Sequence, residues 1–126
     1  MLTDEIKTYN RKQLEELAQN LRGQLVYSVR ENGGHLSSNL GTVELILALH
    51  KVFSFPQDKL IFDVGHQAYV HKLLTGRTLE NLRAQGGVSG FPDPFESEYD
   101  PFIAGHSGNS VAAGIGYCNA RDLRGE

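Results

Sequence analysis

The chain has 126 residues, 40% of them apolar and 21% charged, with a formal net charge of −3. These values are typical of one ordinary globular domain and exclude a disordered chain. No cluster of Lys and Arg could follow a nucleic-acid backbone or an anionic membrane, and no apolar run reaches the ~18 residues that cross a bilayer. The single cysteine, Cys118, excludes an internal disulfide, and the acidic N-terminus has no export segment. We therefore expect a cytoplasmic protein that binds neither nucleic acid nor membrane.

The first predicted element is a long amphipathic helix. Leucine and valine recur at spacings of three and four over residues 14–29, with polar residues between them. Asn10 is a suitable N-cap. The glycine pair 33–34 should end the helix, because glycine readily adopts the left-handed backbone of a helix exit. A loop over 35–39 is expected to follow.

The middle of the chain is predicted to alternate helix, strand and helix. Apolar residues with helical spacing begin at Thr42, and Pro56 closes that region. Residues 60–64 are short, apolar and partly β-branched, which is typical of a strand buried on both faces of a parallel sheet. A further helix is expected over 67–74, ending at Gly76.

The last third begins with a long loop and ends with a helix. Residues 85–101 contain several glycines and prolines, so no regular element can persist there, and loops of this length are usually functional lids or linkers. A second short strand is predicted at 102–104 and a helix rich in small residues at 109–122. Within that helix, Cys118 is expected to be a small buried residue.

Two similar turns, Gly65-His66-Gln67 and Gly105-His106-Ser107, each follow a predicted strand and precede a predicted helix. Free backbone N–H groups at a helix N-terminus favour anions, so this arrangement is typical of phosphate binding in α/β proteins. Two such turns suggest one ligand of the size of a diphosphate. Taken alone, each turn is also compatible with any capped helix.

The predicted fold class is α/β. Two strands are too few for a stable parallel sheet, and the chain ends where the alternation calls for its next strand. We therefore expect residues 1–126 to be an incomplete diphosphate-binding domain. It would be the N-terminal part of a doubly wound parallel-sheet domain, mostly helical, with few strands.

The segment 32–41, Asn-Gly-Gly-His-Leu-Ser-Ser-Asn-Leu-Gly, resembles the 1-deoxy-D-xylulose-5-phosphate synthase family. These enzymes use thiamine diphosphate and belong to the transketolase superfamily. Five further segments are similar to the strand-turn-helix, the lid-like loop and the diphosphate turn of that family: 62–72, 74–77, 86–92, 96–100 and 105–107. The loop is specific to the synthase and is not shared by ordinary transketolase.

The resemblance implies condensation of pyruvate with D-glyceraldehyde 3-phosphate, with loss of CO2, to a precursor of isoprenoids, thiamine and pyridoxal. It implies thiamine diphosphate and Mg²⁺ as cofactors, with the metal ligands outside this chain, and a homodimer for the intact enzyme. His35 would be catalytic, in proton transfer or in stabilising an intermediate. Cofactor contacts would come from His66, Gly105, His106 and Ser107.

Three alternatives remain open at this point. The chain has Gly-Asn-Ser at 108–110 where the family continues with Ser-Thr-Ser, and it ends before the Gly-Asp-Gly motif that binds Mg²⁺. The piece alone is therefore expected to be inactive, and it could be a non-catalytic truncated or split subunit that needs a partner chain. Transketolase-type sugar transfer is the second alternative, which the loop at 86–100 argues against. A zinc site is the third, but His66 and His71 are five residues apart and poorly aligned.

Two other histidines and one aspartate are interpreted as structural. His50 and His71 lie at helical spacing among apolar residues, which favours core or interface positions over ligand binding. Asp63 could be a turn residue, an N-cap or a partner for a neighbouring donor.

Overall fold

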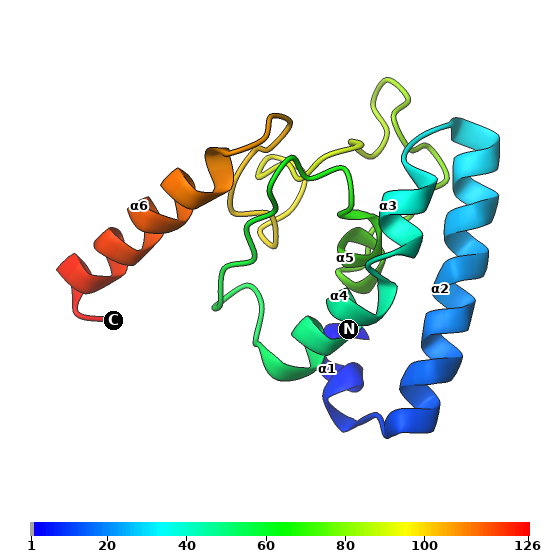
Figure 1. The fold of residues 1–126 in the computed structure, drawn as a ribbon, viewed down its shortest axis with the longest axis horizontal. Helices are drawn as coiled ribbons and strands as arrows, with labels where there is room; N and C mark the ends of the chain where they lie inside the picture. Colours follow the sequence, from blue (N-terminus) through cyan, green and yellow to red (C-terminus); the bar gives the residue numbers. More distant parts are fainter. Residues whose placement is uncertain (1) are drawn as a thin grey trace.

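The computed structural model describes residues 2–126 as a group of helices joined by long loops, with the last helix projecting away from the others (Figure 1). The elements, in chain order, are α1 (Leu2–Glu5), the 3₁₀-helix η1 (Ile6–Thr8), α2 (Arg11–Asn32), α3 (Leu36–Leu40), α4 (Val43–Val52), α5 (Tyr69–Leu74) and α6 (Asn109–Arg124). Helices α2, α4 and α5 pack together, and α3 lies between α2 and α4 in the chain.

The ends of α2 confirm the predicted caps. The Asn10 side chain accepts a hydrogen bond from the Gln13 backbone N–H, and the Gln13 side chain accepts one from the Asn10 N–H. This reciprocal pair is a capping box, which satisfies two donors that the first turn leaves unpaired. At the other end Gly33 has φ +74° and donates its N–H to the carbonyl of Val29.

The loop predicted over 35–39 is wrong, because residues 36–40 form the short helix α3. Side-chain hydrogen bonds to backbone carbonyls four residues earlier support this turn. Thr42 Oγ1 donates to Ser38 O at 3.1 Å, and Asn39 Nδ2 donates to His35 O at 2.6 Å. The helix expected over 67–74 starts later, at Tyr69, because His66 and Gln67 form a turn before it.

The two predicted strands, 60–64 and 102–104, are also wrong. A strand requires hydrogen bonds to a neighbouring strand, and within residues 2–126 neither segment is paired in this way. Phe62 is nonetheless buried, as its strand prediction required, with its ring 5.5 Å from that of His71. Residues 2–126 therefore form a mainly helical structure, and the parallel sheet of the predicted α/β class is not formed among them.

The hydrophobic core lies among η1, α2, α4, α5 and the segment after α5. Its central side chains are fully or almost fully buried: Ile6, Leu21, Leu25, Val43, Ile46, Tyr69, Val70, Leu74 and Leu82. Burying one such side chain contributes roughly 1.5–3 kcal/mol relative to leaving it exposed. This core fixes α5, and with it the turn that precedes α5.

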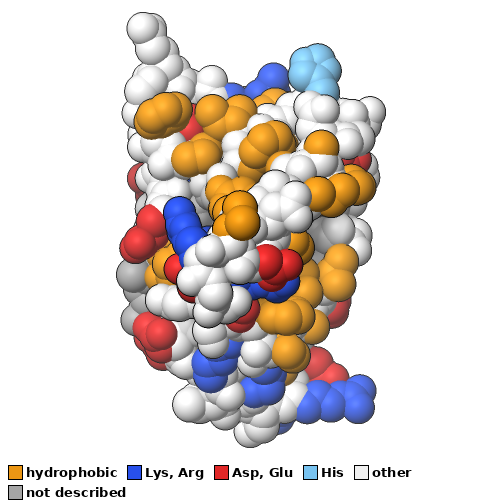
Figure 2. All heavy atoms as spheres, turned by 90° about the vertical axis from the view of Figure 1, so that its left-hand side faces the viewer, with side chains coloured by type: hydrophobic (Ala, Val, Ile, Leu, Met, Phe, Trp, Pro, Cys, Tyr) orange, Lys and Arg blue, Asp and Glu red, His pale blue; other side chains and the backbone are white. Residues whose placement is uncertain are grey.

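Helix α6 buries none of its side chains, so Cys118 is exposed and its prediction as a buried residue is wrong. Val111, Ile115 and Leu123 of this helix are also exposed. Figure 2, which views the molecule from the side on which α6 projects in Figure 1, shows hydrophobic side chains over much of this face. Among residues 2–126, none of the helices has the length and apolar character that crossing a membrane requires.

Candidate active site

Asn39 of α3 is fully buried and joins two segments that contain predicted site residues. Its Nδ2 donates to the carbonyl of His35 at 2.6 Å and to the carbonyl of His66 at 2.8 Å, while its Oδ1 accepts from the Tyr69 N–H at 2.9 Å. Both amide hydrogens and the amide oxygen are therefore used. Asn39 holds the segment before α3 against the turn before α5.

The structure brings His35 and His66 together. Their ring centroids are 5.3 Å apart, and the rings meet edge to face at 69°. Phe91 of the loop 85–101 packs on the His35 ring, with centroids 5.8 Å apart. Both histidines are half-buried. Two of the five predicted site residues thus share one locus, which the long loop covers on one side.

The buried side chain of Tyr69 contacts both the backbone and the ring of His35. Its hydroxyl oxygen accepts a hydrogen bond from the His35 backbone N–H at 3.3 Å and lies 3.1 Å from His35 Nδ1. Burial lowers the pKa of His35 below its ordinary value, and the neighbouring His66 and Arg83 lower it further. His35 is consequently a neutral imidazole at pH 7.

The turn at Gly65 and His66 leaves one polar atom without a partner. His66 Nδ1 is buried and makes no hydrogen bond within residues 2–126. Gly65 has φ +89°, and a Cβ added there would lie 2.5 Å from Pro92 Cδ and 3.1 Å from Ala104 Cβ. The loop 85–101 and the segment before Gly105 therefore press closely against this turn, which only glycine allows.

The second predicted turn, at Gly105, His106 and Ser107, is exposed and attached to the first through Asp63. Asp63 Oδ1 accepts from the Gly108 N–H at 2.8 Å and from Ser110 Oγ at 2.9 Å. The bond from Ser110, with that from Gly108, lowers the pKa of the Asp63 carboxyl group.

Asp63 is thus a partner for neighbouring donors, which is one of the roles left open for it. A Cβ added at Gly105 would meet no atom within 4 Å, so the space beside it is open. Among residues 2–126, no hydrogen bond or ring contact joins His106 to His35 or His66. The structure therefore links the two turns through Asp63 and not through their histidines.

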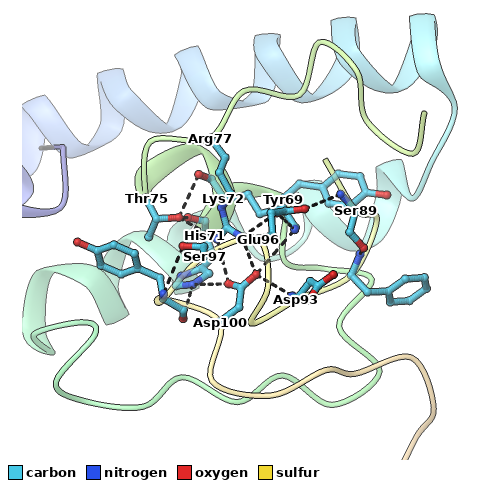
Figure 3. Close-up of polar contacts among 12 residues, drawn as sticks. Tyr69, His71, Lys72, Thr75, Arg77, Ser89, Asp93, Glu96, Ser97 and Asp100 are labelled. Atoms are coloured by element: carbon cyan, nitrogen blue, oxygen red, sulfur yellow. Dashed lines mark hydrogen bonds and ion pairs between the residues drawn. The ribbon is translucent and has the colours of Figure 1, made fainter. Parts of the chain in front are cut away.

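A buried ionic network fastens the loop 85–101 to α5 (Figure 3). Arg77 makes ion pairs with both oxygens of Asp100, at 2.5 and 2.9 Å, and with Glu96 at 2.9 Å. Lys72, which is fully buried, makes an ion pair with Glu96. Burial raises the pKa of Glu96, but the hydrogen bonds and charges of Lys72, Ser89 and Arg77 together outweigh burial, so the pKa falls. Neither this network nor the basic partners on and after α5 were predicted from the sequence.

His50 and His71 are buried in the core, as predicted. Their nitrogens, His50 Nε2 and His71 Nδ1, are 2.9 Å apart, and His71 Nε2 lies 3.2 Å from the carbonyl oxygen of Tyr99 and 3.3 Å from Asp100 Oδ1. Burial lowers the pKa of His50 to about 3, with contributions from His71 and Lys7. Within residues 2–126, no three His, Cys, Asp or Glu side chains are grouped so that they could hold a metal ion.

Comparison with known proteins identifies the family. The family model of 1-deoxy-D-xylulose-5-phosphate synthase matches residues 2–126. The chain belongs to this family. Curated members with the same name are 53% identical to it in Dictyoglomus turgidum, 55% in Syntrophomonas wolfei and 54% in Dechloromonas aromatica, each over 124 residues and 97% of this chain.

These matches cover 20%, 19% and 20% of the three relatives, so the chain spans about a fifth of their length. The family to which the six sequence segments pointed is confirmed.

Proposed function

We propose that this chain is the part of a 1-deoxy-D-xylulose-5-phosphate synthase that carries the catalytic His35 and one side of the thiamine-diphosphate site. The complete enzyme would condense pyruvate with D-glyceraldehyde 3-phosphate, with loss of CO2. The observation that carries this proposal is the 5.3 Å separation of the His35 and His66 rings, which Asn39 fixes through both backbones. The names of the curated relatives support it.

The residues present fit a diphosphate-bearing cofactor. His66 offers a buried nitrogen without a protein partner in residues 2–126, and Gly105 leaves open space beside the backbone of the second turn. Imidazole and backbone N–H groups of His66 and of Gly105, His106 and Ser107 would hold the diphosphate. When bound, thiamine diphosphate supplies the electron sink that decarboxylation requires. We expect the Mg²⁺ ligands to come from other segments of the complete enzyme.

His35 would act on the substrate side of this site. Its neutral imidazole can exchange hydrogen bonds with oxygen atoms of the reacting groups, and the packing of Phe91 and His66 on its ring limits its motion and its contact with water. The family resemblance further implies that the complete enzyme works as a homodimer.

The test is the full-length enzyme that contains this chain, assayed with pyruvate and glyceraldehyde 3-phosphate. His35→Ala should lower kcat by about 10²- to 10⁴-fold while changing the Kd for thiamine diphosphate much less. His106→Ala, the matched control, should weaken cofactor binding more than it lowers kcat at saturating cofactor. Equal losses of turnover and cofactor binding in His35→Ala would reduce His35 to a structural residue. Sugar transfer between ketose and aldose phosphates would indicate transketolase chemistry.

A second candidate is a non-catalytic piece that docks onto another polypeptide carrying the remainder of the fold. The exposed Val111, Ile115 and Leu123 of α6 favour it, because such side chains are usually covered in a working protein. Co-expression with the rest of a synthase, supplied as a separate chain, tests it. Recovery of a stable complex without turnover would favour this candidate over the first.

A further inference from the structure

The hydroxyl group of Tyr69 lies inside the protein and contacts His35. Tyr69 begins α5, has none of its surface exposed, and has its backbone N–H bound by Asn39 Oδ1. Its hydroxyl oxygen has two polar neighbours within hydrogen-bonding distance among residues 2–126, and both belong to His35: the backbone N at 3.3 Å and Nδ1 at 3.1 Å.

The hydrogen bonds at the Tyr69 hydroxyl oxygen determine which ring nitrogen of His35 carries a hydrogen. A phenol has one hydrogen to donate and can accept others. The His35 backbone N–H is a donor, so the oxygen accepts there. The hydrogen of the hydroxyl group then has one acceptor among residues 2–126, His35 Nδ1. If Nδ1 also carried a hydrogen, the buried phenol would be left with an unpaired donor, which costs about 1–3 kcal/mol.

We propose that Tyr69 is a positioning residue that holds His35 in the tautomer with its hydrogen on Nε2, so that His35 presents a hydrogen-bond donor to the bound ligand. The tautomer follows from this structure alone, and its consequence for catalysis rests on the proposed function. His35 Nε2 makes no hydrogen bond within residues 2–126 and is not among the buried atoms that lack a partner, so its surface is open to a substrate oxygen.

The surroundings of Tyr69 keep its hydroxyl group in place. Gly34 has φ +130°, and a Cβ added there would lie 2.8 Å from Tyr69 Oη and 3.3 Å from Cε2. A Cβ added at Gly90 would lie 3.7 Å from the same oxygen. The phenol thus fits between the backbone before His35 and the loop 85–101, so it cannot swing away without displacing one of them. A rigid hydroxyl group makes the tautomer preference specific.

The first measurement is the tautomer itself. In the full chain labelled with ¹⁵N-histidine, long-range ¹H–¹⁵N spectra at pH 7.5 distinguish a protonated nitrogen from an unprotonated one, and a His35→Gln variant assigns the signals. We expect Nε2 protonated and Nδ1 unprotonated. Tyr69→Phe should give a mixture of the two tautomers, whereas Tyr27→Phe, which changes a tyrosine that is 69% exposed, should change nothing. A wild-type His35 with its hydrogen on Nδ1 would overturn the proposal whatever the variants do.

The second measurement uses the full-length enzyme. Tyr69→Phe should lower kcat by about five- to ten-fold, as expected for one lost hydrogen bond, with little change in KM for pyruvate. The pH profile of kcat should shift as well, because the His35 ring loses its hydrogen bond to the Tyr69 hydroxyl group and its pKa changes. A merely structural role of Tyr69 would not produce that shift. Unchanged kcat and pH profile in Tyr69→Phe would contradict the positioning role.

The two proposals fail in different ways. If His35→Ala stays active while the Nε2 tautomer is observed, the catalytic role is wrong and the tautomer stands. If His35→Ala is inactive while Tyr69→Phe leaves the tautomer and kcat unchanged, the role of Tyr69 is wrong and the proposed function stands.

Discussion

The imidazoles of His50 and His71 are joined nitrogen to nitrogen at 2.9 Å, and both are buried. The second nitrogen of His71 lies against the carbonyl oxygen of Tyr99 and the carboxylate of Asp100, which accept hydrogen bonds but do not donate them. In the neutral pair, His71 therefore donates there and accepts from His50 Nε2. Protonation of His50 would place a positive charge in the buried core, close to His71 and Lys7, so the core resists it.

This relationship predicts a loss of stability in acid. Folding lowers the pKa of His50 from 6.5 to about 3, so between these values the unfolded chain binds a proton that the folded chain does not. The free energy of unfolding should thus fall as pH decreases from about 6.5 towards 3, by up to about 1 kcal/mol per pH unit from this group. Urea denaturation at several pH values measures it. The same series on His50→Gln should be flatter in this range, and an equal slope in both proteins would contradict the assignment.

Removing Arg77 should destabilise the chain strongly. Asp100 is 2% exposed, and Arg77→Met would remove the guanidinium that pairs with both of its oxygens. Within residues 2–126, the buried carboxylate would keep only the Asp93 N–H, His71 Nε2 and, at 3.8 Å, Lys72. Breaking a buried ion pair from one side costs about 3–5 kcal/mol. Arg121→Met is the matched control, since the pair of Arg121 with Asp122 is exposed and should contribute less than about 1 kcal/mol. Denaturant unfolding measures the free energy of unfolding of both variants. Similar losses of stability in the two would argue against the buried network.

Asn39→Ala should loosen the candidate site and the core together. It removes three hydrogen bonds and leaves the buried N–H of Tyr69 without its acceptor, at a cost of about 1–3 kcal/mol. Asn20→Ala, on the exposed surface of α2, should change stability by less than about 0.5 kcal/mol. Amide exchange at Tyr69 is the specific readout. Protection of that amide unchanged by Asn39→Ala would contradict the role assigned to Asn39.

Gly65→Ala and Gly76→Ala form a matched pair that separates steric clash from backbone strain. Both glycines have a similar positive φ, +89° and +86°, but a Cβ at Gly65 meets Pro92 at 2.5 Å whereas one at Gly76 meets nothing within 4 Å. Gly76→Ala should cost about 1–2 kcal/mol from backbone strain alone. Gly65→Ala should cost more and should speed proteolysis within the loop 85–101, because the loop must move. Equal costs would show that the loop does not press on the turn.

The local features of the fold were predictable and the non-local ones were not. Asn10 and Gln13 lie three residues apart, and Gly33 follows the last turn directly, so the ends of α2 are encoded within a few residues. The segments 60–64 and 102–104 have strand-like composition, but a strand also depends on a partner far along the chain. Cys118 was misjudged for the same reason, since burial depends on what packs against α6.

In the candidate site, too, the residues could be predicted from the sequence but the contacts between distant residues could not. The six family-like segments pointed to His35, His66 and the turn at 105–107, and the family is now shown, while the roles of these residues remain predictions. Sequence reasoning could not find that Asn39 joins His35 to His66, or that Tyr69 faces His35, because these contacts span 27 to 34 residues. No short-range pattern encodes such contacts.

Helix α6 contributes little to the cooperativity of unfolding, because it buries no side chain against the remaining helices. Its attachment consists chiefly of the two hydrogen bonds to Asp63 and one from the Tyr117 hydroxyl to the carbonyl of Pro101. Amides of α6 should therefore exchange with solvent through openings that leave the core of α2, α4 and α5 intact. The turn at 105–107 leads directly into α6, so any polypeptide that covers α6 would also restrain this turn.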